Sequence, residues 1–119
     1  MKISELNLKT KKAGITIKMK EIRDLREVVS NTDGKLHLLC EALIGDETGS
    51  VFISLWDGQI KQMESGKYYK ITECYCSKHK GAMILNIGKN GKITKTEDKF
   101  EINTKNNLSL KEIHENTLL

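Results

Sequence analysis

Trp56 is the only tryptophan of the chain, and it ends a short alternating run that also contains Phe52. Successive side chains of a β-strand point to opposite faces, so Val51, Ile53 and Leu55 share one face while Phe52 and Trp56 share the other. An outward aromatic ring is either a platform on which nucleic-acid bases stack or a surface covered by another segment or subunit. We expect Trp56 to stack on bases, and both interpretations stay open for Phe52.

Lysines are concentrated in two parts of a chain whose formal net charge is only +4. Residues 77–96 contain five lysines and no acidic residue, and a second basic group, with Lys2, Lys9, Lys11 and Lys12, lies near the N-terminus. This pattern indicates either a face that binds a polyanion or an ordinary solvated surface. The candidates for phosphate contacts are Lys78, Lys80, Lys18, Lys20, Arg23 and Arg26.

Short alternating apolar runs, separated by turn signals, make up most of the chain. They predict strands at residues 15–20 (continuing weakly to 29), 36–44, 51–56, 67–76 and 82–87, with a short helix within 57–64. Turns are predicted at residues 31–34, 45–49 and 80–81, and a further hairpin at Asn90-Gly91 leads into residues 92–94. This strand order predicts an all-β fold, a five-stranded OB-fold Greek-key barrel with a short C-terminal tail.

A closed barrel of this kind needs an apolar interior. The residues expected to supply it are Ile15, Ile17, Met19, Leu38, Val51, Ile53, Leu55, Ile71, Leu85 and Ile87.

We expect residues 1–98 to form the OB domain and residues 99–119 to form a C-terminal extension or tail. Phe100–Ile102 is either an added strand or a loop packed on the barrel. The capping box at Ser109–Glu112 predicts a single helical turn over Leu110–Asn116. Because so short a helix is marginal in water, we interpret the segment as a mobile tail or as a docking peptide for a protein partner or a second copy.

The run GDETGSVFISLW at residues 45–56 resembles the signature of the simple single-stranded-DNA-binding proteins that have one OB fold. Members of this family occur in archaea, and close relatives occur in the eukaryotic DNA-damage complexes that sense single-stranded DNA. The runs SGKYYKI at 65–71 and KGAMILN at 80–86 are similar to the same family. The resemblance covers roughly residues 13 to 95.

The resemblance implies binding of single-stranded DNA without strong sequence preference, protecting it in replication, recombination or repair. Residue by residue, the family's first stacking tryptophan falls on Trp56 and its second aromatic on Tyr75. Its third, a phenylalanine, falls on His79, which offers a smaller ring. This departure predicts weaker binding, or binding that depends on pH near 6 to 7. Some relatives have a further aromatic where this chain has Asn86, and Phe52 is the candidate to compensate.

Tyr75 presents a conflict between strand parity and the resemblance. In a regular strand Tyr75 would share the inward face of Ile71, which makes it a core residue. A β-bulge near Thr72–Cys74 would reverse the parity and turn Tyr75 outward. We favour the bulge.

Other classes of function have little support in the sequence. No apolar run is long enough to span a membrane and no signal peptide is visible, so we expect a cytoplasmic protein, or a nuclear one in a eukaryote. No catalytic arrangement, phosphate-binding loop or dinucleotide motif is present, so we expect neither an enzyme nor a cofactor.

A metal site is also not expected, although several possible ligands lie close in the sequence. Cys74, Cys76 and His79 have a Cys-x-Cys spacing without a second pair, even if His37 and Cys40 lie on a neighbouring strand. The cysteines are expected to be free thiols in a reducing compartment. Two alternatives to DNA binding stay open: an RNA-binding OB module, and a protein–protein OB module of a replication or repair complex.

Overall fold

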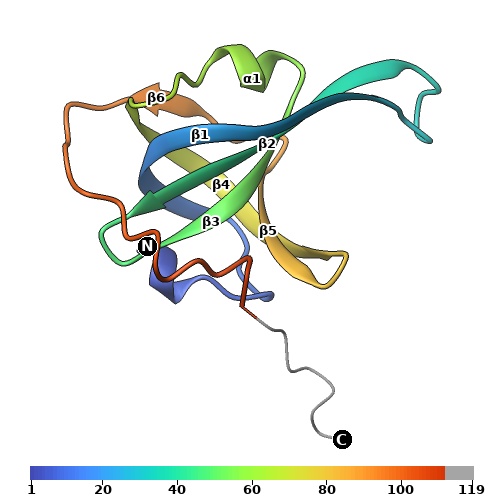
Figure 1. The fold of residues 1–119 in the computed structure, drawn as a ribbon. Helices are drawn as coiled ribbons and strands as arrows, with labels where there is room; N and C mark the ends of the chain where they lie inside the picture. Colours follow the sequence, from blue (N-terminus) through green and yellow to red (C-terminus); the bar gives the residue numbers. More distant parts are fainter. Residues whose placement is uncertain (112–119) are drawn as a thin grey trace, which may run out of the picture.

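The computed structural model describes residues 1–111, and its elements are mostly strands (Figure 1). In chain order they are η1 (Ile3–Glu5), β1 (Ala13–Val29), β2 (Leu36–Asp46), β3 (Gly49–Trp56), α1 (Gly58–Lys61), β4 (Tyr68–His79), β5 (Ala82–Ile87) and β6 (Ile93–Lys95). No helix in this part of the chain is long and apolar enough to cross a membrane.

The first five strands close into a barrel, as the sequence predicts. The sheet order is β1-β2-β3-β5-β4, and an additional pairing of β1 with β4 closes the ring. The β3–β5 pairing is parallel and the other pairings of the ring are antiparallel. Closure leaves few unpaired strand edges, which removes the main route to edge-to-edge association.

The turns at both ends of β5 differ in kind. Lys80 and Gly81 have φ values of 50° and 83°, and His79 pairs with Ala82, so this is the expected tight hairpin. The prediction of a hairpin at Asn90-Gly91 is wrong. Both β5 and the short β6 pair with β4, so residues 88–92 only connect two strands that follow one another along the same edge.

The core lies inside the barrel and contains the expected inward side chains, with two exceptions. Ile17, Met19, Val51, Ile53, Leu55, Ile71 and Leu85 are fully buried, and Ile15 is nearly so. Ile87 is only partly buried at the margin of the core. Leu38 was expected in the core but is 41% exposed. It has the same parity as the buried Cys40 and Ala42, but at Leu38 strand β2 has already left the barrel.

The outer parts of β1 and β2 form a two-stranded arm that projects from the barrel (Figure 1). Arg26 pairs with Leu39 and Val29 with Leu36, and Gly34 takes a φ of 68° in the connecting turn. One face of the arm continues the barrel interior but is exposed, with Leu25, Val29 and Leu36 each more than half accessible.

Strand β4 contains the bulge that the resemblance favours. Glu73 has a φ of 54°, and the pairing with β1 slips between Ile71 and Cys74. Ile71 and Cys74 are both buried although they are three residues apart, so the parity reverses between them. As a result Tyr75 points outward.

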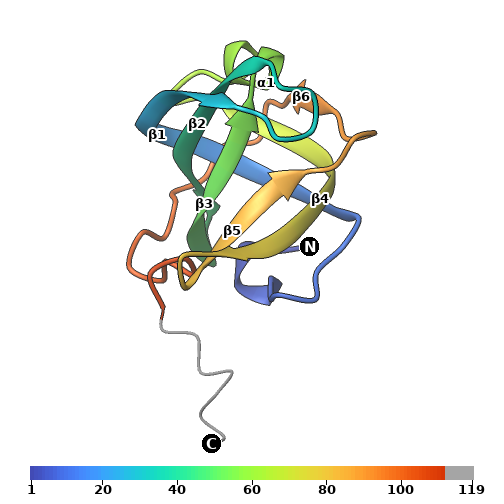
Figure 2. The same ribbon diagram turned by 90° about the vertical axis from the view of Figure 1, so that its right-hand side faces the viewer.

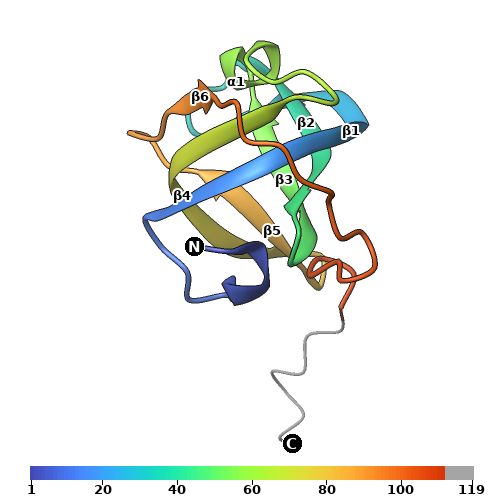
Figure 3. The same ribbon diagram turned by 90° about the vertical axis from the view of Figure 1, so that its left-hand side faces the viewer.

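Residues 100–110, called the C-terminal strap here, pack on the outside of the barrel as a loop (Figure 3). The ring centroids of Phe100 and Tyr68 lie 5.0 Å apart in an edge-on arrangement. The Ser50 N–H donates to Asn106 O over 2.9 Å. The interpretation of this part as a mobile tail is therefore wrong, and the packed-loop alternative is confirmed. The predicted helical turn over Leu110–Asn116 lies almost wholly outside the described residues.

Candidate nucleic-acid interface

A groove of about 360 Å³ is lined by residues of the arm, of β3 and β5, and of the end of β4. Figure 2 shows the strands that carry it, with β3 between β2 and β5. The residues that bear on binding are Arg26, Glu41, Trp56, Lys78, His79 and Asn86. They come from five strands, so closure of the barrel is what brings them together.

Trp56 lies at the end of β3 and opens onto this groove. Its side chain is 41% exposed, and its backbone N–H donates to Gln59 Oε1 over 2.9 Å. The next residue, Asp57, donates its N–H to Leu38 O over 2.9 Å. Hydrogen bonds with α1 and β2 thus fix the backbone around the indole, while the ring itself is accessible.

Tyr75 lies on the same outward face, on the far side of β5. Ser54 pairs with Asn86 and Asn86 pairs with Tyr75, so the three residues form a row across β3, β5 and β4. Adjacent strands are about 4.8 Å apart, which places Tyr75 about 10 Å across the sheet from Ser54. Tyr75 is 42% exposed and lies beyond Asn86, at the margin of the groove.

His79 lines the groove at the end of β4. Four residues of a strand span about 13 Å, so His79 and Tyr75 are separate platforms along one strand. Trp56, Tyr75 and His79, the three residues assigned by the resemblance, therefore share one outward face, with Asn86 between them.

Phe52 has the outward parity of Trp56 but is only 6% exposed. It packs with Leu43 and Ile84 in a small second cluster, and the Arg23 guanidinium lies 4.1 Å from the ring centroid. The ring is therefore covered in this structure by Arg23 of β1, whereas the alternative to stacking that the sequence left open was cover by the C-terminal tail or by a partner subunit.

The six cationic candidates separate into four groups, of which the last, Lys18 and Lys20, lies away from the groove. Arg26 and Lys78 line the groove, and Arg26 lies 3.8 Å from Asp24. Arg23 covers Phe52 and pairs with Glu41 at 3.3 Å. Lys80 lies in the β4–β5 turn beside His79. The groove thus has cations along its sides and acidic groups where the arm begins.

Lys18 and Lys20 do not line the groove. The Lys18 ammonium lies 5.5 Å from the centroid of Tyr68, beside the C-terminal strap. Lys20 is exposed where the pairing of β1 with β2 slips.

A hydrogen-bonded group that the sequence analysis missed connects the turn of the arm to the residue after Trp56. His37 Nδ1 lies 2.6 Å from Asp57 Oδ2, and His37 Nε2 lies 2.9 Å from Asp33 Oδ2. The contact with Asp57, and then that with Asp33, raises the pKa of His37 above its ordinary value. The sequence contained a signal for this group, because one Asp lies in the turn before the strand histidine and another follows Trp56.

The cysteines and His79 do not gather at one place. Cys40, Cys74 and Cys76 are buried, whereas His79 is exposed. Burial raises the pKa of Cys74 to about 12 and that of Cys76 to about 11, so both are thiols at neutral pH. Within residues 1–111 no group of three or more potential metal ligands is found.

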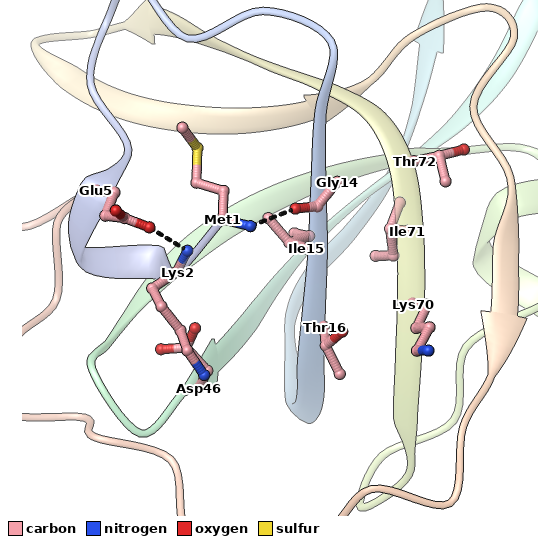
Figure 4. A pocket seen from close by; sticks show the side chains of 10 residues that line it. All are labelled: Met1, Lys2, Glu5, Gly14, Ile15, Thr16, Asp46, Lys70, Ile71 and Thr72. Atoms are coloured by element: carbon pink, nitrogen blue, oxygen red, sulfur yellow. Dashed lines mark hydrogen bonds between the residues drawn. The ribbon is translucent and has the colours of Figure 1, made fainter.

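A second cavity, of about 420 Å³, lies where η1 meets β1 and β4 (Figure 4). The N-terminal ammonium donates to Gly14 O over 3.0 Å across it, and Lys2 pairs with Glu47 at 2.8 Å. Neither Trp56 nor His79 lines this cavity. It has no aromatic side chain in its lining, so it lacks the stacking surface that distinguishes the groove.

A closed OB barrel with aromatic and cationic side chains on one outward face has the architecture of an OB-fold binding module. Residues 3–95 match the family described as single-stranded DNA binding protein Ssb-like, OB fold. The chain therefore belongs to this family.

Individual relatives agree with this assignment. The chain is 29% identical over 100 residues to the single-stranded DNA binding protein Ssb of Saccharolobus solfataricus, an alignment that covers 83% of this chain and 66% of that protein. The chain thus spans just under two thirds of that relative's length.

Solved structures show the same fold. A hypothetical protein from Arabidopsis thaliana superposes with a TM-score of 0.78 at 28% identity, covering 94% of this chain and 83% of that chain. The OB domain of Ta0387 from Thermoplasma acidophilum superposes with a TM-score of 0.71 at 20% identity, covering 87% of this chain and 92% of that chain.

Proposed function

We propose that this protein binds single-stranded DNA by stacking bases on Trp56, Tyr75 and His79 while cations of the groove contact the phosphates. The observation that carries the proposal is the exposure of two large aromatic side chains on one face, 41% for Trp56 and 42% for Tyr75. Every base has a flat face, so such platforms bind without strong sequence preference. The family described above supports DNA as the ligand.

The cations differ in whether this proposal gives them a direct contact with the DNA strand. Arg26 and Lys78 contact the strand inside the groove, and Lys80 contacts it where it passes the β4–β5 turn. Arg23 acts indirectly, because it covers Phe52, which packs against Ile84 in the lining of the groove. Lys18 and Lys20 lie away from the groove and carry no phosphate contact there.

The role that follows is protection of single strands during replication, recombination or repair, by a cytoplasmic binding protein that performs no chemistry on its ligand. The OB domain is proposed to comprise residues 1–98, with the following residues as an extension that begins with the strap.

The test is titration of the protein with oligo-dT while the fluorescence of Trp56 is followed. We expect quenching at low salt that is reversed by added salt, because phosphate contacts release counterions. Competition by oligo-dT, oligo-U and duplex DNA separates a DNA-binding from an RNA-binding module. Absence of quenching by any nucleic acid would contradict the proposal and favour a protein–protein module.

The variant Trp56→Ala tests the stacking role of this residue. Its binding is measured with a labelled oligonucleotide because the variant lacks the fluorophore. Loss of one stacked base costs about 1–3 kcal/mol, so we expect the Kd to rise about 5- to 150-fold. Trp56→Phe, which keeps an aromatic face, is the control and is expected to retain most of the affinity. Equal affinities of the Ala variant and the wild type would remove Trp56 from the site.

A further inference from the structure

Beyond Tyr75 the surface falls into a separate depression of about 330 Å³. Its lining includes Lys11, Lys12, Lys89, Glu73 and Tyr75. Tyr75 lines the depression and is also connected through Asn86 to Ser54, which lines the groove, so the depression adjoins the outward face on which the groove lies.

The fold anchors both lysine-bearing segments to β4 around the bulge. The Cys76 N–H donates to Thr10 O over 3.1 Å, which holds the segment that leads into Lys11 and Lys12. The Gly88 N–H donates to Glu73 O over 2.8 Å, which holds the segment that leads into Lys89. A Cβ at Gly88 would lie 2.7 Å from Glu73 O, so the close approach requires glycine.

The charges of the depression are unbalanced. Among the described residues, Lys11, Lys12 and Lys89 take part in no ion pair or side-chain hydrogen bond, unlike Lys2, which pairs with Glu47. Glu73 is the single carboxylate in the lining. Three ammonium groups around one carboxylate, next to an exposed aromatic ring, favour an anionic ligand that also has a flat apolar part.

We propose that this depression is a phosphate-binding subsite for the nucleotides that follow the base stacked on Tyr75, so that the bound strand continues past β4. The proposal rests on the single-stranded-DNA binding proposed above and extends its path. It assigns Lys11, Lys12 and Lys89 to the ligand, none of which lines the groove. Two basic groups that are far apart in the sequence meet at one aromatic ring.

The test compares the triple variant Lys11→Gln, Lys12→Gln, Lys89→Gln with a control of equal charge change, Lys70→Gln, Lys95→Gln, Lys105→Gln. The control lysines are exposed, and none of them lines the groove or the depression. Binding of a long oligo-dT is measured by Trp56 fluorescence at several salt concentrations. Each lost phosphate contact lowers the slope of log K against log salt by about 0.7 for single strands.

We expect the slope of the first triple to be shallower than that of the control by about 2, which corresponds to three phosphates. The final amplitude of Trp56 quenching should stay at the wild-type level, because the groove is unchanged. Equal slopes for the two triples would overturn the subsite while leaving the proposed function intact. If the wild-type protein itself fails to bind oligo-dT, the proposed function fails first.

Discussion

At the scale of single residues, two aromatic side chains with the same strand parity have different environments. Phe52 lies in the middle of β3, between Leu43 on β2 and Ile84 on β5, and Arg23 covers its ring. Trp56 lies at the end of β3, where β5 no longer runs alongside. Position along the strand, rather than residue type, therefore decides that only Trp56 offers an open ring.

The His79 position can be tested by restoring the aromatic ring that the family has there. We expect His79→Phe to tighten single-stranded-DNA binding at pH 8 by about 2- to 10-fold, a fraction of the 1–3 kcal/mol of a full stacking contact. Titration with a labelled oligonucleotide at pH 8 measures the effect. Affinity that is unchanged at pH 8 would mean that no base stacks at this position.

At the scale of elements, the arm and the bulge position the site. The bulge at Glu73 turns Tyr75 outward while Ile71 and Cys74 both stay in the core. Within the arm, His37 connects the turn residue Asp33 to Asp57, the residue after Trp56. The orientation of the arm next to the indole thus depends on an ionic group.

The pH dependence of this group follows from the direction of its pKa shifts. The raised pKa of His37 means that its stabilising effect is full below about pH 6.5 and is lost as the pH rises through the folded-state value. Asp57 has a lowered pKa, caused first by the Leu38 N–H and then by His37. Backbone hydrogen bonding at Lys35, and then His37, lowers the pKa of Asp33. Their stabilising effect is present above about pH 4 and is lost as the pH falls through their folded-state values.

We therefore expect the arm to be most ordered between about pH 4 and 6.5. An NMR titration of the His37 ring should give a midpoint above 6.5, and Asp57→Asn should lower it. Asp24→Asn, in an acidic residue of the arm that lies near Arg26, is the control and should leave the midpoint unchanged. A His37 midpoint that is equal in the wild type and in Asp57→Asn would contradict the assignment.

At the scale of the whole molecule, the C-terminal strap is part of the folded barrel. Ser109 is 2% exposed, and its hydroxyl accepts from the Phe52 N–H over 2.9 Å and donates to Met83 O. These contacts connect the strap to both β3 and β5, which are two of the strands that carry the groove. A docking role for residues 99–119 stays a prediction.

Removal of this hydroxyl tests the contribution of the strap to stability. Ser109→Ala leaves a buried Phe52 N–H without its acceptor, which costs about 1–3 kcal/mol. We expect a lower free energy of unfolding by this amount in denaturant titrations, with little change in DNA affinity. Ser65→Ala, at an exposed serine, is the control and should stay within about 0.5 kcal/mol of the wild type. Equal stability of Ser109→Ala and the control would mean that the strap is not bound in solution.

The sequence was sufficient for features that depend on neighbours in the chain. The alternation of Val51–Trp56 determines which side chains enter the core, and Lys80-Gly81 determines a hairpin because it supplies the positive φ angles that this turn requires. The bulge was foreseen only because the family resemblance disagreed with the parity of Tyr75. Asn90-Gly91 shows the limit, since the same kind of turn signal joins two strands that both pair with β4.

The tertiary structure decided what depends on contacts between distant residues. Whether Phe52 is open or covered depends on Arg23 of β1, a strand that β2 separates from β3, and the exposure of Leu38 depends on where the arm leaves the barrel. Lys11, Lys12 and Lys89 meet because backbone hydrogen bonds tie their segments to the same bulge. The sequence by itself therefore determined the strands, the OB fold and Trp56 as an outward-facing ring. Only closure of the barrel decided which side chains surround that ring, because local patterns contain no information about which distant segments come into contact.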